Sequence, residues 1–193
     1  MKTLIFDTET SGWPSQNYPA THPSQPILLE LGAQLWDDAR LVGAISVLIK
    51  PYLPGRQVAV GALRAHGITI QRAEREGVQA KAALSIFNTL LDAADEVAAH
   101  NLEFDLRVIE MVYAQLRVGE PPWPVTRICT MQSGRPLAKA AGSGASLAEL
   151  YALATERQLE NAHSAAADCQ ACREVLLWLR REGALQAPTP PLL

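Results

Sequence analysis

The sequence lacks several features that define other classes of protein. No apolar run approaches the ~20 residues that a helix needs to cross a bilayer, so we predict no membrane partner. The N-terminus does not resemble a signal peptide, because a short apolar run leads directly into Asp7 and Glu9. We therefore predict a cytoplasmic location.

Cysteine is scarce as well. The chain of 193 residues has three, an odd number that does not suggest a disulfide framework. Cys169 and Cys172 form a C-x-x-C pattern, but a zinc site would need two more ligands, and only Cys129 and scattered histidines remain. The two cysteines instead continue an apolar stripe at helical spacing, with Ala165, Leu176 and Leu179. We predict that both thiols are small core residues.

The chain also lacks a surplus of basic residues. Its net charge of −3 argues mildly against broad electrostatic binding of nucleic acid. However, a cluster of metal-binding carboxylates would contribute negative charges that bound cations cancel. Local basic residues could still follow a short strand.

The pattern of apolar residues and turn formers predicts an α/β domain with a mixed sheet. Strands are expected at 2–7, 27–36, 41–49, 96–99 and 125–129, the first three forming an antiparallel meander. Helical segments are expected over 57–93 with breaks at Gly67 and Gly77, and at 101–117, 130–139, 146–154 and 164–181. Asn101 is a good N-cap for its helix, and 11–26 is a long loop. The domain should cover 1–183, followed by a proline-rich tail at 184–193 that is disordered over 187–193.

Asp7 and Glu9 end the first predicted strand, in Leu4-Ile5-Phe6-Asp7-Thr8-Glu9-Thr10. Side chains two residues apart on a strand point to the same face, so the two carboxylates project together. Two such anions repel unless a cation lies between them, and Mg²⁺ or Mn²⁺ takes oxygen ligands of this kind. The alternative is an exposed acidic pair at a strand end.

Asp105 and the pair His163 and Asp168 are the other candidates. Asp105 falls near the start of its helix, where an acid also stabilises the helix dipole. On one helix, His163 and Asp168 would lie about 140° apart. If Ser164 caps the helix, His163 instead lies on the preceding loop and can hang over a metal that Asp168 binds; the alternative is an ordinary surface histidine. Carboxylates with a nearby base can hold two divalent cations and activate a water against a phosphodiester, so the chain is a candidate metal-dependent nuclease.

Three segments resemble the exonuclease motifs of the DEDDh 3′–5′ exonucleases, the group that includes the epsilon proofreading subunit of bacterial DNA polymerase III. They are Phe6–Gly12, His100–Asp105 and His163–Asp168. Weaker matches are Glu30–Ala33 in the second strand, His66–Thr69 in a segment that reaches the substrate in this family, and Ser146–Leu150 before the third motif. The resemblance spans about residues 3–180, with the segments in the expected order and spacing.

This resemblance implies a ribonuclease H-like fold, with a five-stranded mixed sheet flanked by helices. It implies that Asp7 bridges two Mg²⁺ or Mn²⁺ ions, and that Glu9 and Asp168 complete the protein ligands of the first. Asp105 would serve the second ion, and His163 would be the general base. Substrate binding is expected of Thr8, Thr10, Trp13, His66, Asn101 and Phe104.

The aromatic residues near the first motif leave two interpretations open. Trp13 and Tyr18 lie in the loop 11–26, and they could stack on the terminal base of a single strand. Alternatively, they pack the loop against the domain. Phe104 has the same ambiguity, as a core aromatic or a stacking residue.

The implied function is a metal-dependent 3′–5′ exonuclease that releases nucleoside monophosphates from the 3′ end of single-stranded DNA. An exoribonuclease acting on small RNA is the first alternative, and it differs in how the site treats the 2′-hydroxyl. A polymerase-associated nucleic-acid-binding module without catalysis is the second, although all five candidate catalytic residues are present. Proofreading with a DNA polymerase partner, and repair or end trimming, both fit the sequence.

Overall fold

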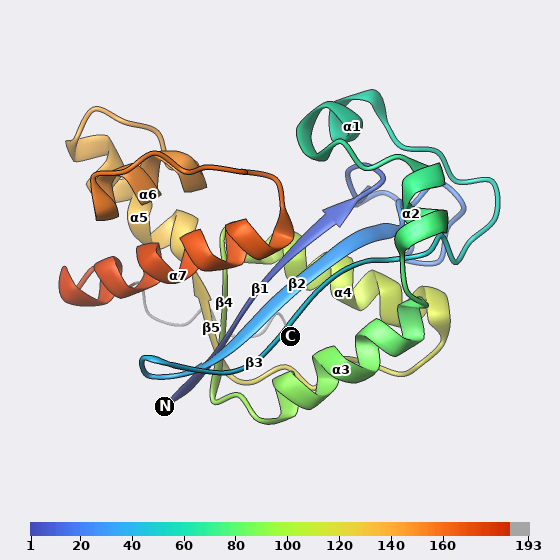
Figure 1. Cartoon of the computed structure of the whole chain (residues 1–193), viewed down its shortest axis with the longest axis horizontal. Coiled ribbons are helices and arrows are strands. Elements are labelled where there is room, and N and C mark those ends of the chain that lie inside the picture. Colours follow the sequence, from blue (N-terminus) through green and yellow to red (C-terminus); the bar gives the residue numbers. More distant parts are fainter. Residues whose placement is uncertain (186–193) are drawn as a thin grey trace.

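The computed structural model describes residues 1–185, and the tail predicted to be disordered, 187–193, lies outside them. The described residues build a mixed sheet of five strands in the order β3-β2-β1-β4-β5 (Figure 1). The strands are β1 (Lys2–Thr10), β2 (Leu28–Asp37), β3 (Arg40–Leu48), β4 (Glu96–Ala99) and β5 (Thr126–Cys129). The helices are α1 (Val60–His66), α2 (Ile70–Glu76), α3 (Ala80–Asp92), α4 (Leu102–Leu116), α5 (Thr130–Ala140), α6 (Leu147–Thr155) and α7 (Ala165–Arg181). The predicted α/β, ribonuclease H-like fold is confirmed.

The central strand β1 runs further than predicted, to Thr10 rather than to Asp7. It pairs antiparallel with β2 along its whole length, from Lys2 opposite Asp37 to Thr10 opposite Leu28. On its other side it pairs in parallel with β4, but only over residues 3–5. The second half of β1 therefore extends beyond β4, where side chains from helices can approach it.

Alternate residues of β1 face two different helical layers. Leu4 and Phe6 pack in the cluster built with α3 and α4. Ile5 packs on the opposite face with Cys169 and Cys172 of α7. Both thiols are buried there, which confirms that the C-x-x-C pattern belongs to the core.

The predicted helical stretch 57–93 forms three helices that are interrupted at Gly67 and Gly77, as expected. Gly67 ends α1 with a φ of 69°, a left-handed conformation that glycine adopts without strain, and its N–H donates to the carbonyl of Leu63. The start of this stretch is joined to β1, because the N–H of Ala59 donates to the carbonyl of Ser11 at 2.8 Å. Helix α1 accordingly stands beside the C-terminal end of β1 (Figure 1).

The prediction that Asn101 is the N-cap of α4 is confirmed, although its side chain does not make the cap. Asn101 does precede the helix, but its φ of 64° and ψ of 48° are left-handed, and its side chain makes no capping hydrogen bond. Asparagine tolerates this conformation better than most residues, because its short polar side chain can bond locally. The sharp turn redirects the chain from β4 into α4.

The last described residues continue the domain beyond α7. Ala184 and Leu185, which the sequence assigns to the tail, pack against the apolar cluster of α6 and α7. Among residues 1–185, no helix is both long and apolar enough to cross a membrane.

Candidate functional site

The second half of β1 carries the first two acidic residues of the site. Asp7 and Glu9 share the face of Ile5 and point toward α7, as side chains two residues apart on a strand must. Both side chains are half-buried. Thr8 lies between them and points to the opposite face, toward α4.

Thr8 connects β1 to the third acidic residue, Asp105 of α4. The carboxylate Oδ1 of Asp105 accepts hydrogen bonds from the backbone N–H of Thr8 at 3.0 Å and from its hydroxyl at 2.7 Å. Asp105 is 2% exposed and lies in the first turn of α4, where an acid also stabilises the helix dipole. These two bonds fix Asp105 beside the end of β1.

His163 and Asp168 approach from the N-terminus of α7. As predicted, His163 lies on the loop before the helix and Asp168 in its first turns, although the Ser164 side chain makes no capping bond. The backbone N–H of His163 instead donates to Oδ2 of Asp168 at 3.0 Å. His163 has a φ of 67°, and this left-handed backbone turns its exposed side chain toward the acids of β1.

The three elements meet in a cluster suited to a cation. One possible ligand atom from each of Glu9, His163 and Asp168 lies within 4.8 Å of the others. Two further carboxylate oxygens, Oδ2 of Asp7 and Oδ1 of Asp168, are buried without a hydrogen-bond partner among the described residues. Ionised carboxylates only accept, and a buried acceptor without a donor is costly. A hard divalent cation is the partner that such oxygens prefer, so these residues fit Mg²⁺ or Mn²⁺.

The electrostatics of the cluster lead to the same conclusion. Burial, together with the charges of Asp168, Glu30 and Asp105, raises the pKa of Glu9 to about 8. Burial also raises the pKa of Asp105 to about 8, against the two hydrogen bonds from Thr8. The pKa values of Asp7 and Asp168 are raised too, mainly by burial. A bound cation would favour the ionised carboxylates and reverse these shifts.

Glu30 and Gly32 of β2 are part of this arrangement, although no role was predicted for either residue. Glu30 lies opposite Glu9 in the strand pairing, and its Oε2 accepts a hydrogen bond from the N–H of Ala165 at 3.3 Å. A Cβ added to Gly32 would come within 2.6 Å of the carbonyl oxygen of Ala165. Since Ala165 is the first residue of α7, β2 supports the helix end that carries His163 and Asp168. The Glu30–Ala33 match was the available signal.

Two of the residues expected to bind substrate have hydroxyl groups that are occupied within the protein. Thr8 is 4% exposed and donates to Asp105, as described above. Thr10 is 5% exposed and donates to the carbonyl of Gly12 at 2.6 Å. Both hydroxyl groups therefore stabilise the site from within, and a role of the two residues in substrate binding stays a prediction.

His66 is also held by backbone groups. Its Nδ1 accepts a hydrogen bond from the N–H of Ile68 at 3.0 Å, so its Nε2 carries the proton that faces the carbonyl of Thr10, also at 3.0 Å. Burial lowers the pKa of His66, and the neighbouring His163 lowers it further. The neutral ring therefore ties the end of α1 to the end of β1, on the side of the site where His163 lies.

The two aromatic residues of the loop 11–26, Trp13 and Tyr18, have different surroundings. Tyr18 stacks on His22 of the same loop, with ring centroids 4.1 Å apart, so it does pack the loop. Trp13 also contacts the domain, but its side chain stays 78% exposed. It meets the half-buried ring of Phe104 edge to face, with centroids 5.0 Å apart. The two rings form an aromatic ledge beside the first and second motifs.

Residues 4–176 match the protein family described as exonuclease, RNase_T. No curated protein gives a significant sequence match.

Two solved structures illustrate the similarity of fold. Exonuclease I of E. coli in complex with a dT13 oligonucleotide aligns with a TM-score of 0.72 and 20% identity, over 95% of this chain and 41% of its own. A 3′-exonuclease, in a structure of 3′-end specific recognition of a histone mRNA stem-loop, aligns with a TM-score of 0.73 and 12% identity, over 98% of this chain and 68% of its own. The chain thus spans about two-fifths of the length of exonuclease I.

Proposed function

Because the chain belongs to the exonuclease family, we propose that it removes nucleoside monophosphates from the 3′ end of single-stranded DNA with the help of divalent cations. The observation that carries the proposal is the pair of buried carboxylate oxygens, Oδ2 of Asp7 and Oδ1 of Asp168, for which the described residues supply no donor. They lie where Glu9 and His163 also converge, so the site combines cation ligands with a base.

Four acids would hold the cations. Asp7 would be shared between two ions, Glu9 and Asp168 would complete the ligands of one, and Asp105 would serve the other. When bound, two such ions stabilise the attacking and the leaving oxygen of an in-line displacement at phosphorus. Thr8 contributes by holding the carboxylate of Asp105 in place through two hydrogen bonds.

His163 would accept the proton of the attacking water. Its side chain is exposed on a loop, and its ring reaches the carboxylates of Glu9 and Asp168. Histidine can exchange a proton near neutral pH, and an exposed ring can pass that proton on to solvent. The hydrogen bond from its backbone to Asp168 keeps the base aligned with the acids.

Trp13 and Phe104 would receive the terminal base. An exposed ring next to a half-buried one offers an apolar face to a base without reading its identity. The backbone of the turn at Asn101, which leads into α4, would line the same end of the site.

The proteins of similar fold support a 3′ exonuclease activity, and they differ in whether the strand is DNA or RNA. Exonuclease I is seen with a DNA oligonucleotide, and this favours a DNA strand here. The 3′-exonuclease seen with a histone mRNA stem-loop favours the second candidate, a 3′–5′ exoribonuclease with the same catalytic residues. Proofreading beside a polymerase and independent repair or trimming both stay predictions.

The proposal is tested with purified protein and 5′-labelled single-stranded DNA and RNA of matched sequence. Each is incubated with Mg²⁺, Mn²⁺ or EDTA, beside the variant Asp7→Asn. The expected result is a ladder that shortens from the 3′ end with either cation, is absent with EDTA, and is lost in the variant. Cleavage that persists in EDTA or in Asp7→Asn would contradict the metal assignment, and faster cleavage of RNA would select the second candidate.

A further inference from the structure

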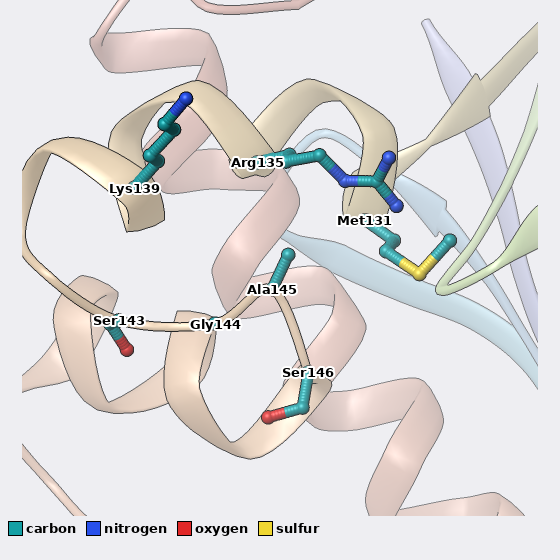
Figure 2. A pocket seen from close by; sticks show the side chains of 7 residues that line it. All are labelled: Met131, Arg135, Lys139, Ser143, Gly144, Ala145 and Ser146. Carbon is teal, nitrogen blue, oxygen red and sulfur yellow. The ribbon is translucent and has the colours of Figure 1, made fainter.

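A hollow of about 480 Å³ lies on the α5–α6 side of the domain, outside the acidic cluster (Figure 2). One wall is α5, from which Met131, Arg135 and Lys139 line the hollow. The other wall is the segment 143–146, between α5 and α6. Figure 2 shows Arg135 and Lys139 on the same helix, above this segment.

The two basic side chains of the hollow have no counter-ion among residues 1–185. Arg135 and Lys139 are four residues apart, so they share one face of α5 and are separated by about 6 Å along its axis. Both are exposed, and neither side chain forms an ion pair or hydrogen bond with the residues that the structure describes. By contrast, Arg72 and Arg180 are paired with glutamates.

The opposite wall is fixed in place by Glu149 of α6. Its carboxylate accepts hydrogen bonds from the N–H groups of Gly144 and Ser146 and from the Ser146 hydroxyl, and the N–H of Glu149 donates back to that hydroxyl. This capping box holds the segment 143–146 against the start of α6. Glu149 is not among the residues that line the hollow. Its carboxylate bonds to the segment 143–146 and pairs with neither Arg135 nor Lys139.

His100 links the hollow to the proposed active site. It stands at the end of β4, next to the turn at Asn101 that leads into the helix of Asp105. Its Nδ1 lies 3.1 Å from the hydroxyl of Thr130, the first residue of α5, and its ring also bonds to the backbone of Ala145 in the wall of the hollow. The same residue therefore contacts both walls and is the first residue of the second motif.

A larger groove along α4, of about 1170 Å³, is a poorer path for a phosphate backbone. It is lined by three acids, Glu103, Glu110 and Glu120. Its two arginines already bond to backbone carbonyls: Arg107 to that of Ser15 at 2.6 Å, and Arg127 to that of Pro124 at 3.1 Å. Within the part of the chain that the structure describes, the smaller hollow has two unpaired cations and no lining acid.

We infer that the hollow between α5 and residues 143–146 is a binding site for backbone phosphates of the nucleic-acid strand, upstream of its 3′ end. This inference rests on the proposed function for the identity of its ligand. Arg135 and Lys139 supply the positive charge, and Met131 supplies an apolar floor. The site holds the strand without taking part in hydrolysis.

The test compares the double variant Arg135→Ala/Lys139→Ala with the control Lys81→Ala/Arg117→Ala, which removes two exposed charges from α3 and the end of α4. Binding of a 5′-labelled oligothymidylate is measured by fluorescence anisotropy in EDTA, so the result does not depend on catalysis. Log K falls linearly with log of the salt concentration, and the loss of two phosphate contacts should make this slope less steep by about 1.4. If the variant and the wild type bind equally at 1 M salt, the variant should therefore bind about 25-fold more weakly at 0.1 M salt. The control should bind as the wild type does.

A second substrate separates the two proposals. The p-nitrophenyl ester of thymidine 5′-monophosphate is too short to reach the hollow, so the double variant should hydrolyse it at the wild-type rate in Mg²⁺. Unchanged affinity for the oligonucleotide, or an equal loss in the control variant, would overturn the inference. If the wild type hydrolyses neither substrate, the proposed function fails, while the anisotropy still decides whether the hollow binds the strand.

Discussion

Replacing Gly32 with alanine tests whether β2 positions the N-terminus of α7. The added Cβ would lie 2.6 Å from the carbonyl oxygen of Ala165, whereas ordinary contact begins at 3.4 Å, so relief requires a shift of about 0.8 Å. The obstacle is a backbone oxygen, which cannot rotate away as a side chain would. Since Ala165 lies between His163 and Asp168 along the chain, the shift displaces both.

The expected loss is larger for turnover than for folding. Overpacking of this kind costs about 1–3 kcal/mol, which lowers Tm by roughly 2–12 °C in a chain of this size. Misplacing a reacting group by about 1 Å costs on the order of 100-fold in rate, so kcat should fall on the order of tenfold to 100-fold. Affinity for an oligonucleotide in EDTA should change little, because the aromatic ledge of Trp13 and Phe104 lies elsewhere.

Gly43→Ala on β3 provides the matched control. There the added Cβ would lie 2.8 Å from Cδ2 of Leu90, the far end of a flexible side chain that can move away. We expect a small loss of Tm and a wild-type kcat. Both variants are assayed well below their Tm, with hydrolysis of the p-nitrophenyl ester as the readout. If Gly32→Ala retains wild-type kcat while losing stability, β2 supports the fold but does not align the site.

Three further predictions concern the proposed site itself. His163→Ala should lower kcat on the order of 10²- to 10⁴-fold with little change in oligonucleotide affinity, and equal turnover would exclude it as the base. Trp13→Ala should weaken binding of a single strand by about 1–3 kcal/mol, measured by anisotropy against Tyr18→Ala, whose ring is already stacked on His22. The metal-free protein should lose thermal stability as pH rises from about 4.5 to 8, because the pKa of Glu9 rises from 4.5 to about 8 on folding, so the folded state binds more protons than the unfolded state in this range. Mg²⁺ at about 100 times its Kd should raise the free energy of unfolding by about 2.7 kcal/mol, and a Tm that is insensitive to Mg²⁺ at pH 8 would argue against the cation site.

Much of the fold could be predicted because it depends on local patterns. The turn formers at Gly67 and Gly77 divide the helices where the structure divides them. The spacing of Cys169 and Cys172 identified a buried helix face, and the spacing of Asp7 and Glu9 identified a shared strand face. Each of these inferences needs only the periodicity of a single element.

The features that could not be predicted depend on contacts between distant parts of the chain. Glu30 bonds to Ala165, 135 positions further along, and the hydroxyl of Thr8 bonds to Asp105, 97 positions further along. Neither pairing leaves a trace in local periodicity. At Asn101 the local rule identified the N-cap position but not its conformation, because the residue makes a left-handed turn between β4 and α4 and its side chain makes no capping bond.

Net charge is a weak guide to what this chain binds, because its charges are segregated. The acids of the site are buried together, and their raised pKa values show that they are costly to ionise without a cation. Bound cations would cancel the negative charge of these acids at the place where the scissile phosphate has to lie. The acids would then no longer repel the strand. Outside the site, attraction then depends on where the basic side chains without a counter-ion lie among the described residues, as Arg135 and Lys139 do at the hollow, rather than on the sum of −3. A strand would be held by local cations at the hollow and by bound metal at its end.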